Sequence, residues 1–423
     1  MNRVEVLMEE AVQQLSGILV KKGVSLDGDS PEDKRQAEHL SADIIERLLV
    51  SHKMQLKPEE YTSLRHEIVE ACFGYGPIQP LINDPCVTDI MVNGPDQIFV
   101  ERNGVLEKSD IEFKDEEAVV KWVNRILGEG EKRIDRNTPY VDISIRNNAR
   151  VTVVIPPIAA DVTSFVIRKK MRRGYTFQDL INLGTLDQKT FDFLKYCVSA
   201  QLNILITGGT GAGKTTLLNL LIRELVPPLA RVVVMEDTEE IILDPARHAM
   251  KMLTRPPLPD GKGEVTLQEL VKLSLHLRPD RLVIGEIRGE EVFSLLQAIN
   301  TGHDGSMCTI HANSSQDAIA RLEMLSLMAK SNIQIEVVRR FIKSGMDLVI
   351  HMTRFPGGKR MVSQISELHL QGNDLLVKDI FNLRRSVENG KEVMQIKPTG
   401  HIPSFFNRLK VYGDIQEDFF RND

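Results

Sequence analysis

A glycine-rich run decides the fold of this chain: Gly208-Gly209-Thr210-Gly211-Ala212-Gly213-Lys214-Thr215. It satisfies the pattern G-x-x-x-x-G-K-[ST] and lies between an apolar run, 203–207, and a helical run that includes Thr216. The backbone N–H groups of such a loop close around phosphate oxygens, and the helix start adds partial positive charge. Lys214 is expected to reach the β- and γ-phosphates, and the Thr215 hydroxyl to hold Mg²⁺. The sequence therefore predicts a site for ATP and Mg²⁺ at residues 208–216.

Apolar runs alternate with helical patterns after Gly184, which is typical of an α/β domain with a largely parallel sheet. Besides the run before the loop, four runs are predicted as strands: Arg231–Glu236, Arg281–Glu286, Ser306–His311 and Asp347–Met352. Ligands of open α/β sheets bind outside the carboxyl ends of the strands. We therefore expect the residues at the ends of these runs to meet at one site.

Acidic residues stand at the ends of two of these predicted strands. Glu236 opens a segment with four acids in five positions that ends at Glu240, and one of these acids could orient the attacking water. Glu286 ends the next apolar run, where P-loop ATPases place the acid that holds Mg²⁺ or orients water. General P-loop proteins more often have aspartate there, so Glu286 indicates either a variant family or a strand-end acid without a role. The acidic segment could equally be a solvated loop.

Two histidines, His303 and His311, bracket the predicted strand 306–311. They could sense the γ-phosphate or couple two domains, or they could be structural. A zinc site is excluded because no further ligands stand at metal-binding spacing. The four cysteines contain no C-x-x-C pair, which also argues against a disulfide framework.

The residues before Gly184 have a different pattern. We expect an N-terminal helical bundle at 1–75, an α+β domain at 76–174, a linker at 175–185 and the nucleotide-binding domain at 186–423. A basic run, Arg168–Arg173, ends the α+β domain. It could be a solvated linker, a patch for a polyanion or a donor of arginine to nucleotide phosphates.

Composition and charge exclude several classes of protein. The chain has 423 residues with 53 Lys+Arg and 59 Asp+Glu, a net charge of 53 − 59 = −6, which does not favour binding to nucleic acid. No stretch approaches the roughly 18 consecutive apolar residues of a membrane span, and the first residues lack the apolar core of a signal peptide. We therefore expect a cytoplasmic protein without a membrane span.

In chain order, four segments resemble the Walker A, Asp box, Walker B and His box of the secretion traffic ATPases, which serve type II secretion, type IV pili and type IV secretion. They are 208–215, 236–240, 278–289 and 301–314. Upstream, the stretches Gly74–Leu81, Thr88–Pro95 and Ile155–Pro157 are similar to the CpaF-type ATPases of the Tad (Flp) pilus. The resemblance covers most of the chain from about 74 to about 370.

This resemblance implies a ring-forming homo-oligomer, a hexamer, with a PAS-like N-terminal α+β domain and a RecA-like ATPase domain. It implies docking on an inner-membrane platform protein at the cytoplasmic face of the inner membrane, with ATP hydrolysis driving pilus movement or secretion. The residues that match the family's motifs are then assigned as follows. Lys214 and Thr215 bind phosphate and Mg²⁺, Glu236 and Glu240 are the Asp-box acids, Glu286 is the Walker B acid, and His303 and His311 form the His box. Arg150 and Arg168 match arginines that approach the phosphates when the domains close.

Three alternatives stay open from the sequence. A RecA-like nucleic-acid motor fits the P-loop and the basic run, but the net charge and the lack of aromatic residues among the basic ones count against it. A nucleotide-gated scaffold would bind ATP without needing hydrolysis. A small-molecule kinase would need an acceptor pocket, and the sequence indicates none.

Overall fold

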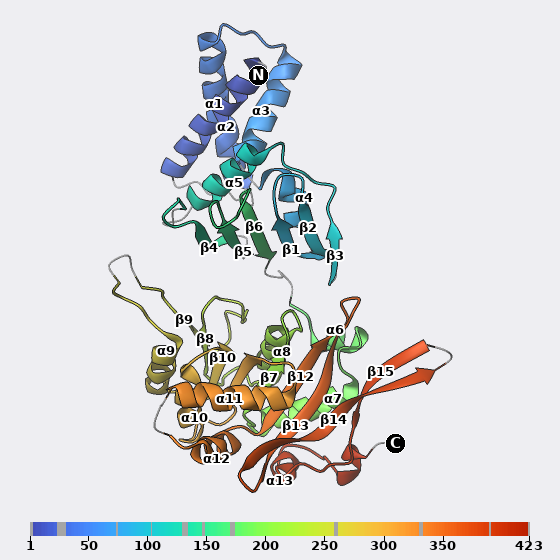
Figure 1. Cartoon of the computed structure of the whole chain (residues 1–423). Helices are drawn as coiled ribbons and strands as arrows, with labels where there is room; N and C mark the ends of the chain where they lie inside the picture. The colour runs from blue at the N-terminus through green and yellow to red at the C-terminus, as the bar shows by residue number, and fades with distance from the viewer. Residues whose placement is uncertain are drawn as a thin grey trace. The chain divides into compact units, whose positions relative to one another are not determined.

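The computed structural model describes residues 3–22, 31–72, 75–102, 104–128, 134–145, 149–169, 174–257, 261–329, 333–388 and 391–421. The chain divides into two compact units, Met1–Arg172 and Arg173–Asp423 (Figure 1). The finer boundaries expected from the sequence, 1–75, 76–174, 175–185 and 186–423, stay a prediction. Residues 170–173 of the basic run lie outside the described residues.

The N-terminal unit begins with three helices, α1 (Arg3–Lys21), α2 (Pro31–Ser51) and α3 (Pro58–Cys72). Proline is the first residue of both α2 and α3, and acidic residues follow it in the first turn of each. These residues favour a helix start, because proline lacks the N–H that would be unsatisfied there and acids face the positive end of the helix dipole. Apolar side chains from all three helices form one buried cluster, which includes Leu7, Leu15, Ile44, Ile45 and Ile68.

An antiparallel sheet follows in the same unit, with the strand order β3-β2-β1-β6-β5-β4. The strands are β1 (Val87–Val92), β2 (Ile98–Arg102), β3 (Val105–Lys108), β4 (Tyr140–Ile145), β5 (Ala149–Val154) and β6 (Ser164–Lys169). The helical elements are η1 (Gly76–Ile78), α4 (Gln79–Asn83) and α5 (Glu116–Gly128). Trp122 of α5 stacks on Phe165 of β6 with ring centroids 4.2 Å apart, and its Nε1 donates to the Tyr75 carbonyl at 2.9 Å. This contact joins the helix to the sheet.

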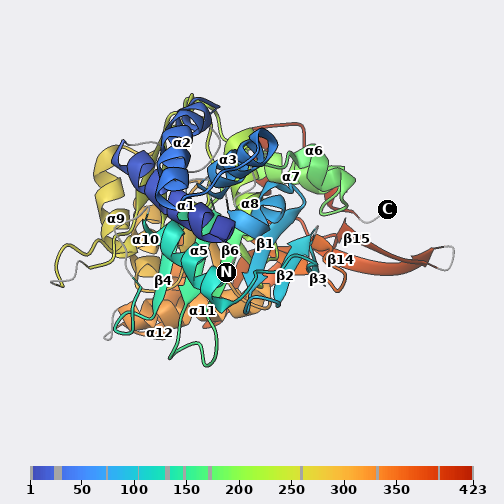
Figure 2. The same ribbon diagram turned by 90° about the horizontal axis from the view of Figure 1, so that it is seen from above.

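The C-terminal unit is built on a mixed sheet, which within the described residues has nine strands in the order β15-β14-β13-β12-β7-β11-β10-β8-β9. Neighbours from β12 to β9 are parallel, and β13, β14 and β15 are added antiparallel at one edge. The parallel strands are β7 (Ile204–Gly208), β8 (Val232–Glu236), β9 (Ala249–Leu253), β10 (Arg281–Ile287), β11 (Met307–His311) and β12 (Leu348–Arg354). The antiparallel strands are β13 (Arg360–Gln371), β14 (Asp374–Glu388) and β15 (Lys391–Pro398). In both Figure 1 and Figure 2 the ribbon of β14 and β15 extends beyond the rest of this unit.

Helices cover both faces of the parallel sheet because its strands alternate apolar side chains between two cores. In β7, Ile204 and Ile206 belong to one core and Leu205 to the other. The first core is covered by α7 (Gln188–Ser199), α8 (Lys214–Leu220), η2 (Leu221–Leu225), α13 (Phe406–Lys410) and η4 (Glu417–Phe420), with α6 (Phe177–Asn182) beside them. The second is covered by α9 (Leu267–Ser274), η3 (Leu275–Leu277), α10 (Glu291–Ile299), α11 (Ser315–Ala329) and α12 (Ile335–Gly345).

The predicted fold class, α/β with an N-terminal α+β part and a RecA-like sheet, is confirmed. All five predicted core strands are present, with ends that differ by one or two residues. Strand β9 was not predicted. It lies at the sheet edge, where Met250 and Leu253 are exposed, so it lacks the continuous apolar run that marks the buried strands.

Candidate active site

The P-loop follows β7 directly and ends where α8 begins at Lys214. Gly208 has φ +151°, a conformation that favours glycine, and a Cβ at this position would clash with the carbonyl oxygen of Met352 on β12. The loop can therefore turn away from β7 only with glycine at this point. Thr215 and Thr216 follow Lys214 in the first turn of α8 and are half-buried.

The ammonium group of Lys214 is buried at the loop and is held by the loop itself. Its Nζ donates to the carbonyls of Gly208 and Gly209, each at 3.0 Å. Burial lowers the pKa of Lys214, and the carboxylates of Glu286 and Glu240 oppose that shift. A cation is thus held where the backbone of the loop would surround phosphate.

His311, at the carboxyl end of β11, connects Lys214 to Glu286. Its ring nitrogens lie 3.4 and 3.5 Å from the Nζ of Lys214, and its Nε2 lies 3.1 Å from Oε1 of Glu286. Burial and the charge of Lys214 lower the pKa of His311, and Glu286 raises it. On the other side of Glu286, Arg288 Nη2 donates to Oε2 at 2.6 Å. The two oxygens of this carboxylate are therefore oriented by two different side chains.

Glu236 ends β8 beside this group, but its carboxylate is turned into the protein. Only 3% of the residue is exposed, and its carboxylate accepts the backbone N–H groups of Glu240 and Ile241 at 3.1 to 3.3 Å. Burial raises its pKa to about 7 although those two N–H groups lower it. Glycine at 285 leaves room for this side chain, since a Cβ there would lie 2.8 Å from Cγ of Glu236. Glu236 thus fixes the acidic segment, and Glu240 stays exposed at the end of that segment.

His303 is not part of this group of side chains. It precedes the amino end of β11, and its Nδ1 lies 3.0 Å from the carbonyl of Ala298, near the end of α10. Strand β11 runs from Met307 to His311, which is about 13 Å at 3.3 Å per residue, so His303 stands before its amino end and His311 at its carboxyl end. The structure therefore places the two histidines at opposite ends of the same strand.

Arg150 and Arg168 belong to the N-terminal unit, where each is paired with a carboxylate of its own sheet. Arg150 on β5 donates from Nε to both carboxylate oxygens of Asp142 at 2.8 and 2.9 Å. Arg168 on β6 donates from Nε to Asp89 on β1 at 2.9 Å. The catalytic roles expected for these arginines stay predictions.

Two arginines that were not predicted from the sequence lie against the P-loop. Arg360 Nε donates to the carbonyl of Gly211 at 2.7 Å, and Arg354 Nη1 would lie 3.0 Å from a Cβ on the same glycine. Arg354 ends β12, the last along the chain of the six parallel strands that the structure describes, and Arg360 begins β13, so both residues lie at the P-loop. The rule that ligands bind at the carboxyl ends of strands could have found them, although no known motif marks them.

The residues at this edge fit Mg²⁺ as a partner of bound phosphate. Within the described part of the chain no group of three or more His, Cys, Asp or Glu side chains could hold a metal ion by itself. Mg²⁺ commonly takes one or two protein oxygens, with phosphate and water completing its coordination. The half-buried hydroxyl of Thr215 and the carboxylate of Glu286 match that donor set.

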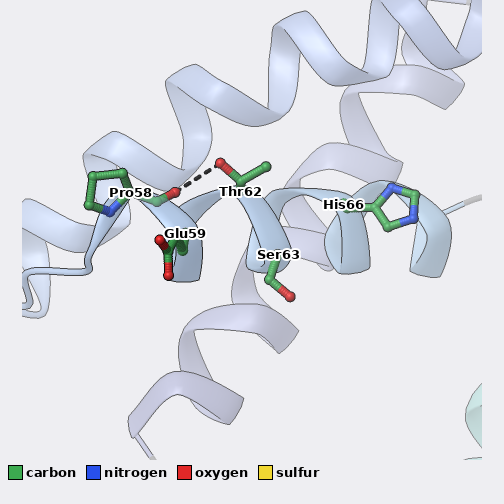
Figure 3. A pocket seen from close by; sticks show the side chains of 5 residues that line it. All are labelled: Pro58, Glu59, Thr62, Ser63 and His66. Carbon is green, nitrogen blue, oxygen red and sulfur yellow. Dashed lines mark hydrogen bonds between the residues drawn. The ribbon is translucent and has the colours of Figure 1, made fainter.

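A hollow on the outside of α3 offers no comparable chemistry. Figure 3 shows the exposed residues that line it, which are Pro58, Glu59, Thr62, Ser63 and His66. The Thr62 hydroxyl donates to the carbonyl of Pro58 in the same helix at 2.8 Å. The candidate site is therefore at the P-loop.

The family "Type II/IV secretion system protein" matches residues 73–375, which is more than half of the chain. The chain belongs to this family. Its members are ATPases, which supports ATP binding and hydrolysis here. The resemblance to the secretion traffic ATPases is confirmed at this level, whereas the CpaF branch stays a prediction.

Two curated relatives illustrate the match. A Mycobacterium tuberculosis protein named for conjugal transfer is 35% identical over 302 residues, which cover 70% of this chain and 84% of that protein. The type IV secretion system protein PtlH of Bordetella pertussis is 31% identical over 308 residues, covering 66% of this chain and 89% of that protein. Among solved structures, the VirB11 ATPase of the Brucella suis type IV secretion system, in complex with sulphate, has 24% identity and a TM-score of 0.38, covering 68% of this chain and 91% of that chain.

Within the residues that the structure describes, no helix is both long enough and apolar enough to cross a membrane.

Proposed function

We propose that this chain is the motor of a Tad pilus, of the CpaF type: a hexameric ring that hydrolyses ATP to power pilus assembly or retraction, or secretion across the inner membrane. It would work at the cytoplasmic face of that membrane with a platform protein as its partner. Membership of the type II/IV secretion family supports the general activity. The upstream stretches 74–81, 88–95 and 155–157, all within the matched residues, support the CpaF branch.

One observation carries the proposal of hydrolysis: the Lys214–His311–Glu286 group at the P-loop. A P-loop that only binds nucleotide needs the lysine and the backbone amides. Here Arg288 and His311 each orient one oxygen of the Glu286 carboxylate, and the ring of His311 lies between that carboxylate and Lys214. Such a carboxylate can orient a water molecule for attack on phosphate.

The other residues have supporting roles in this proposal. Thr215 and Glu286 hold Mg²⁺, which would neutralise charge on the phosphates. Glu236 keeps the acidic segment folded beside the site, so that Glu240 faces solvent there. Arg150 and Arg168 supply positive charge from the N-terminal unit, and His303 supports the end of α10.

The test is Mg²⁺-dependent ATP turnover per chain, measured across a wide range of protein concentration. We expect the rate per chain to rise with concentration, because sites in a ring are completed by assembly. Lys214→Ala should remove turnover at every concentration, because the loop then lacks the cation that reaches the β- and γ-phosphates. Turnover in the wild type that is independent of concentration down to the monomer would contradict the ring.

None of the three alternative functions is favoured. A nucleic-acid motor is opposed by the net charge of −6, and tight single-strand binding at physiological salt would be needed to revive it. A scaffold that needs only binding would have no use for the oriented carboxylate of Glu286.

A further inference from the structure

The turn between β12 and β13 brings two arginines to the P-loop of the same chain. Strand β12 lies parallel to β7, with Met352 beside Gly208, so β12 reaches the loop and ends at Arg354. The chain then turns and returns as β13, which begins at Arg360. Arg354 and Arg360 are direct partners across this antiparallel pair. Their side chains therefore leave the same face of the hairpin.

The hairpin turn is fixed by its own contacts. The N–H of Phe355 donates to the Lys359 carbonyl at 2.8 Å, and the N–H of Gly358 donates to the Phe355 carbonyl at 3.1 Å. The guanidinium of Arg385, on β14, lies over the Phe355 ring, 5.7 Å from its centroid. The backbone that carries the two arginines is therefore held beside the loop and does not depend on a bound ligand.

Both arginines meet the loop at Gly211, the fourth residue of the motif. Arg360 Nε donates to its carbonyl at 2.7 Å. Gly211 has φ +68°, and a Cβ there would lie 3.0 Å from Nη1 of Arg354, so glycine allows this guanidinium to approach the loop backbone. The hairpin thus supplies positive charge at the position where backbone amides would receive phosphate.

With Lys214 buried in the same loop, three positively charged side chains lie at the P-loop. Arginine is suited to phosphate because its planar fork can donate two hydrogen bonds at once. The nucleotide phosphates are the anion that the proposed function brings to this loop.

We propose that Arg354 binds the β- and γ-phosphates of the nucleotide held by its own subunit, and that Arg360 is a positioning residue that holds the P-loop through Gly211. This inference rests on the proposed ATPase function. It adds a contribution from the end of β12 that no motif of the family resemblance includes.

The test compares binding of ATP, ADP and AMP to the full chain and to Arg354→Gln, Arg354→Lys and Arg360→Gln. Arg340→Gln, which removes an exposed charge from α12, is the matched control. We expect Arg354→Gln to weaken ATP binding about tenfold, the scale of a lost hydrogen bond to a charged group, to weaken ADP less and to leave AMP unchanged. Arg354→Lys should recover part of the loss. Inorganic tripolyphosphate, used as a competitor of ATP, should lose affinity for Arg354→Gln by a similar factor.

Arg360→Gln should weaken ATP and ADP by similar factors, because a displaced loop affects every ligand that occupies it. Arg360→Lys, which keeps a donor for the Gly211 carbonyl, should recover part of that loss. Thermal unfolding without nucleotide checks that each variant is folded.

The outcomes separate this inference from the function beneath it. Wild-type chain that binds ATP while Arg354→Gln binds it as tightly as Arg340→Gln does would overturn the assignment of Arg354. An equal loss for AMP and ATP would also overturn it, because AMP lacks the β- and γ-phosphates and the arginine would then contact the nucleoside or the α-phosphate. Wild-type chain that binds no ATP would overturn the proposed function itself, and this inference with it.

Discussion

The two ends of the parallel sheet in the C-terminal unit use polar side chains in different ways. At the amino end, side chains bond to backbone groups: Asp347 accepts the N–H of Asn203 at 2.9 Å, and the side chain of Asn203 accepts the N–H of Ser306 at 2.9 Å. At the carboxyl end, side chains face one another, as Lys214, His311 and Glu286 do. The first arrangement stabilises the sheet, whereas the second holds charges in place for an incoming anion.

The largest effect should come from Glu286→Gln. The variant keeps the size of the side chain but loses the charge that orients water and holds Mg²⁺, so turnover should fall by roughly a hundredfold or more. ATP binding should stay within about threefold, because the loop and Lys214 are unchanged. Turnover and ATP affinity, measured side by side, check this prediction. Full turnover in Glu286→Gln would mean that the Glu286 carboxylate, like the polar side chains at the amino end of the sheet, has no part in hydrolysis.

Glu236 is an exception to this difference between the two ends of the sheet. It stands at the carboxyl end of β8, but its carboxylate accepts hydrogen bonds from backbone N–H groups, as the side chains at the amino end do. Burial raises its pKa from 4.5 to about 7, so between these values the folded chain binds more protons than the unfolded chain. Its contribution to stability therefore falls as pH rises through this window, by about 3 kcal/mol in total. The free energy of unfolding of Glu236→Gln, relative to that of the wild type, should therefore rise by that amount between pH 4.5 and pH 8.

Hydrogen exchange of the β8 amides, compared between wild type and variant at the same pH, measures this change, since the intrinsic exchange rate cancels. Glu264→Gln, which removes an exposed carboxylate outside this segment, is the control for a general effect of charge. A difference between wild type and Glu236→Gln that stays constant with pH would show that Glu236 does not titrate in this window.

The smallest effects should come from the two histidines, and they should have opposite character. His311→Ala removes the group between Lys214 and Glu286 and should lower turnover about tenfold, or about 1.4 kcal/mol, with little change in stability. His303→Ala should leave turnover unchanged but cost about 1 kcal/mol of stability, because it removes a bond to the Ala298 carbonyl. Turnover and hydrogen exchange at the end of α10, measured on both variants, check the pair. Equal losses of turnover would remove the distinction between the two ends.

The sequence predicted the α/β sheet and the position of the P-loop because both depend on local patterns. Each buried parallel strand is a short apolar run, and the loop glycines are needed where the chain must turn tightly, as at Gly208. The edge strands of the described sheet, β9 and β15, each pair with one neighbour and lack a continuous apolar run, and neither was predicted.

The site was predicted in part, for a similar reason. Motif residues that follow strands, such as Lys214, Glu286 and His311, could be placed at one edge from sequence order alone. The inward turn of Glu236 depends on Gly285 in a neighbouring strand, and the approach of Arg354 and Arg360 depends on which strand lies beside β7. Strand order is a property of the whole sheet, and no single segment of the sequence encodes it.

Trp122, which stacks on Phe165, makes the tryptophan fluorescence of this chain report on the N-terminal unit. Trp122 is the only tryptophan in the sequence, and it is buried in the apolar core of the N-terminal unit. Tryptophan emission excited at long wavelength therefore comes from one unit alone, and the nucleotide-binding unit is silent at that wavelength. Release of α5 from its sheet would shift the emission to the red. Unfolding of the N-terminal unit can therefore be followed by fluorescence while the sheet that carries the P-loop stays folded.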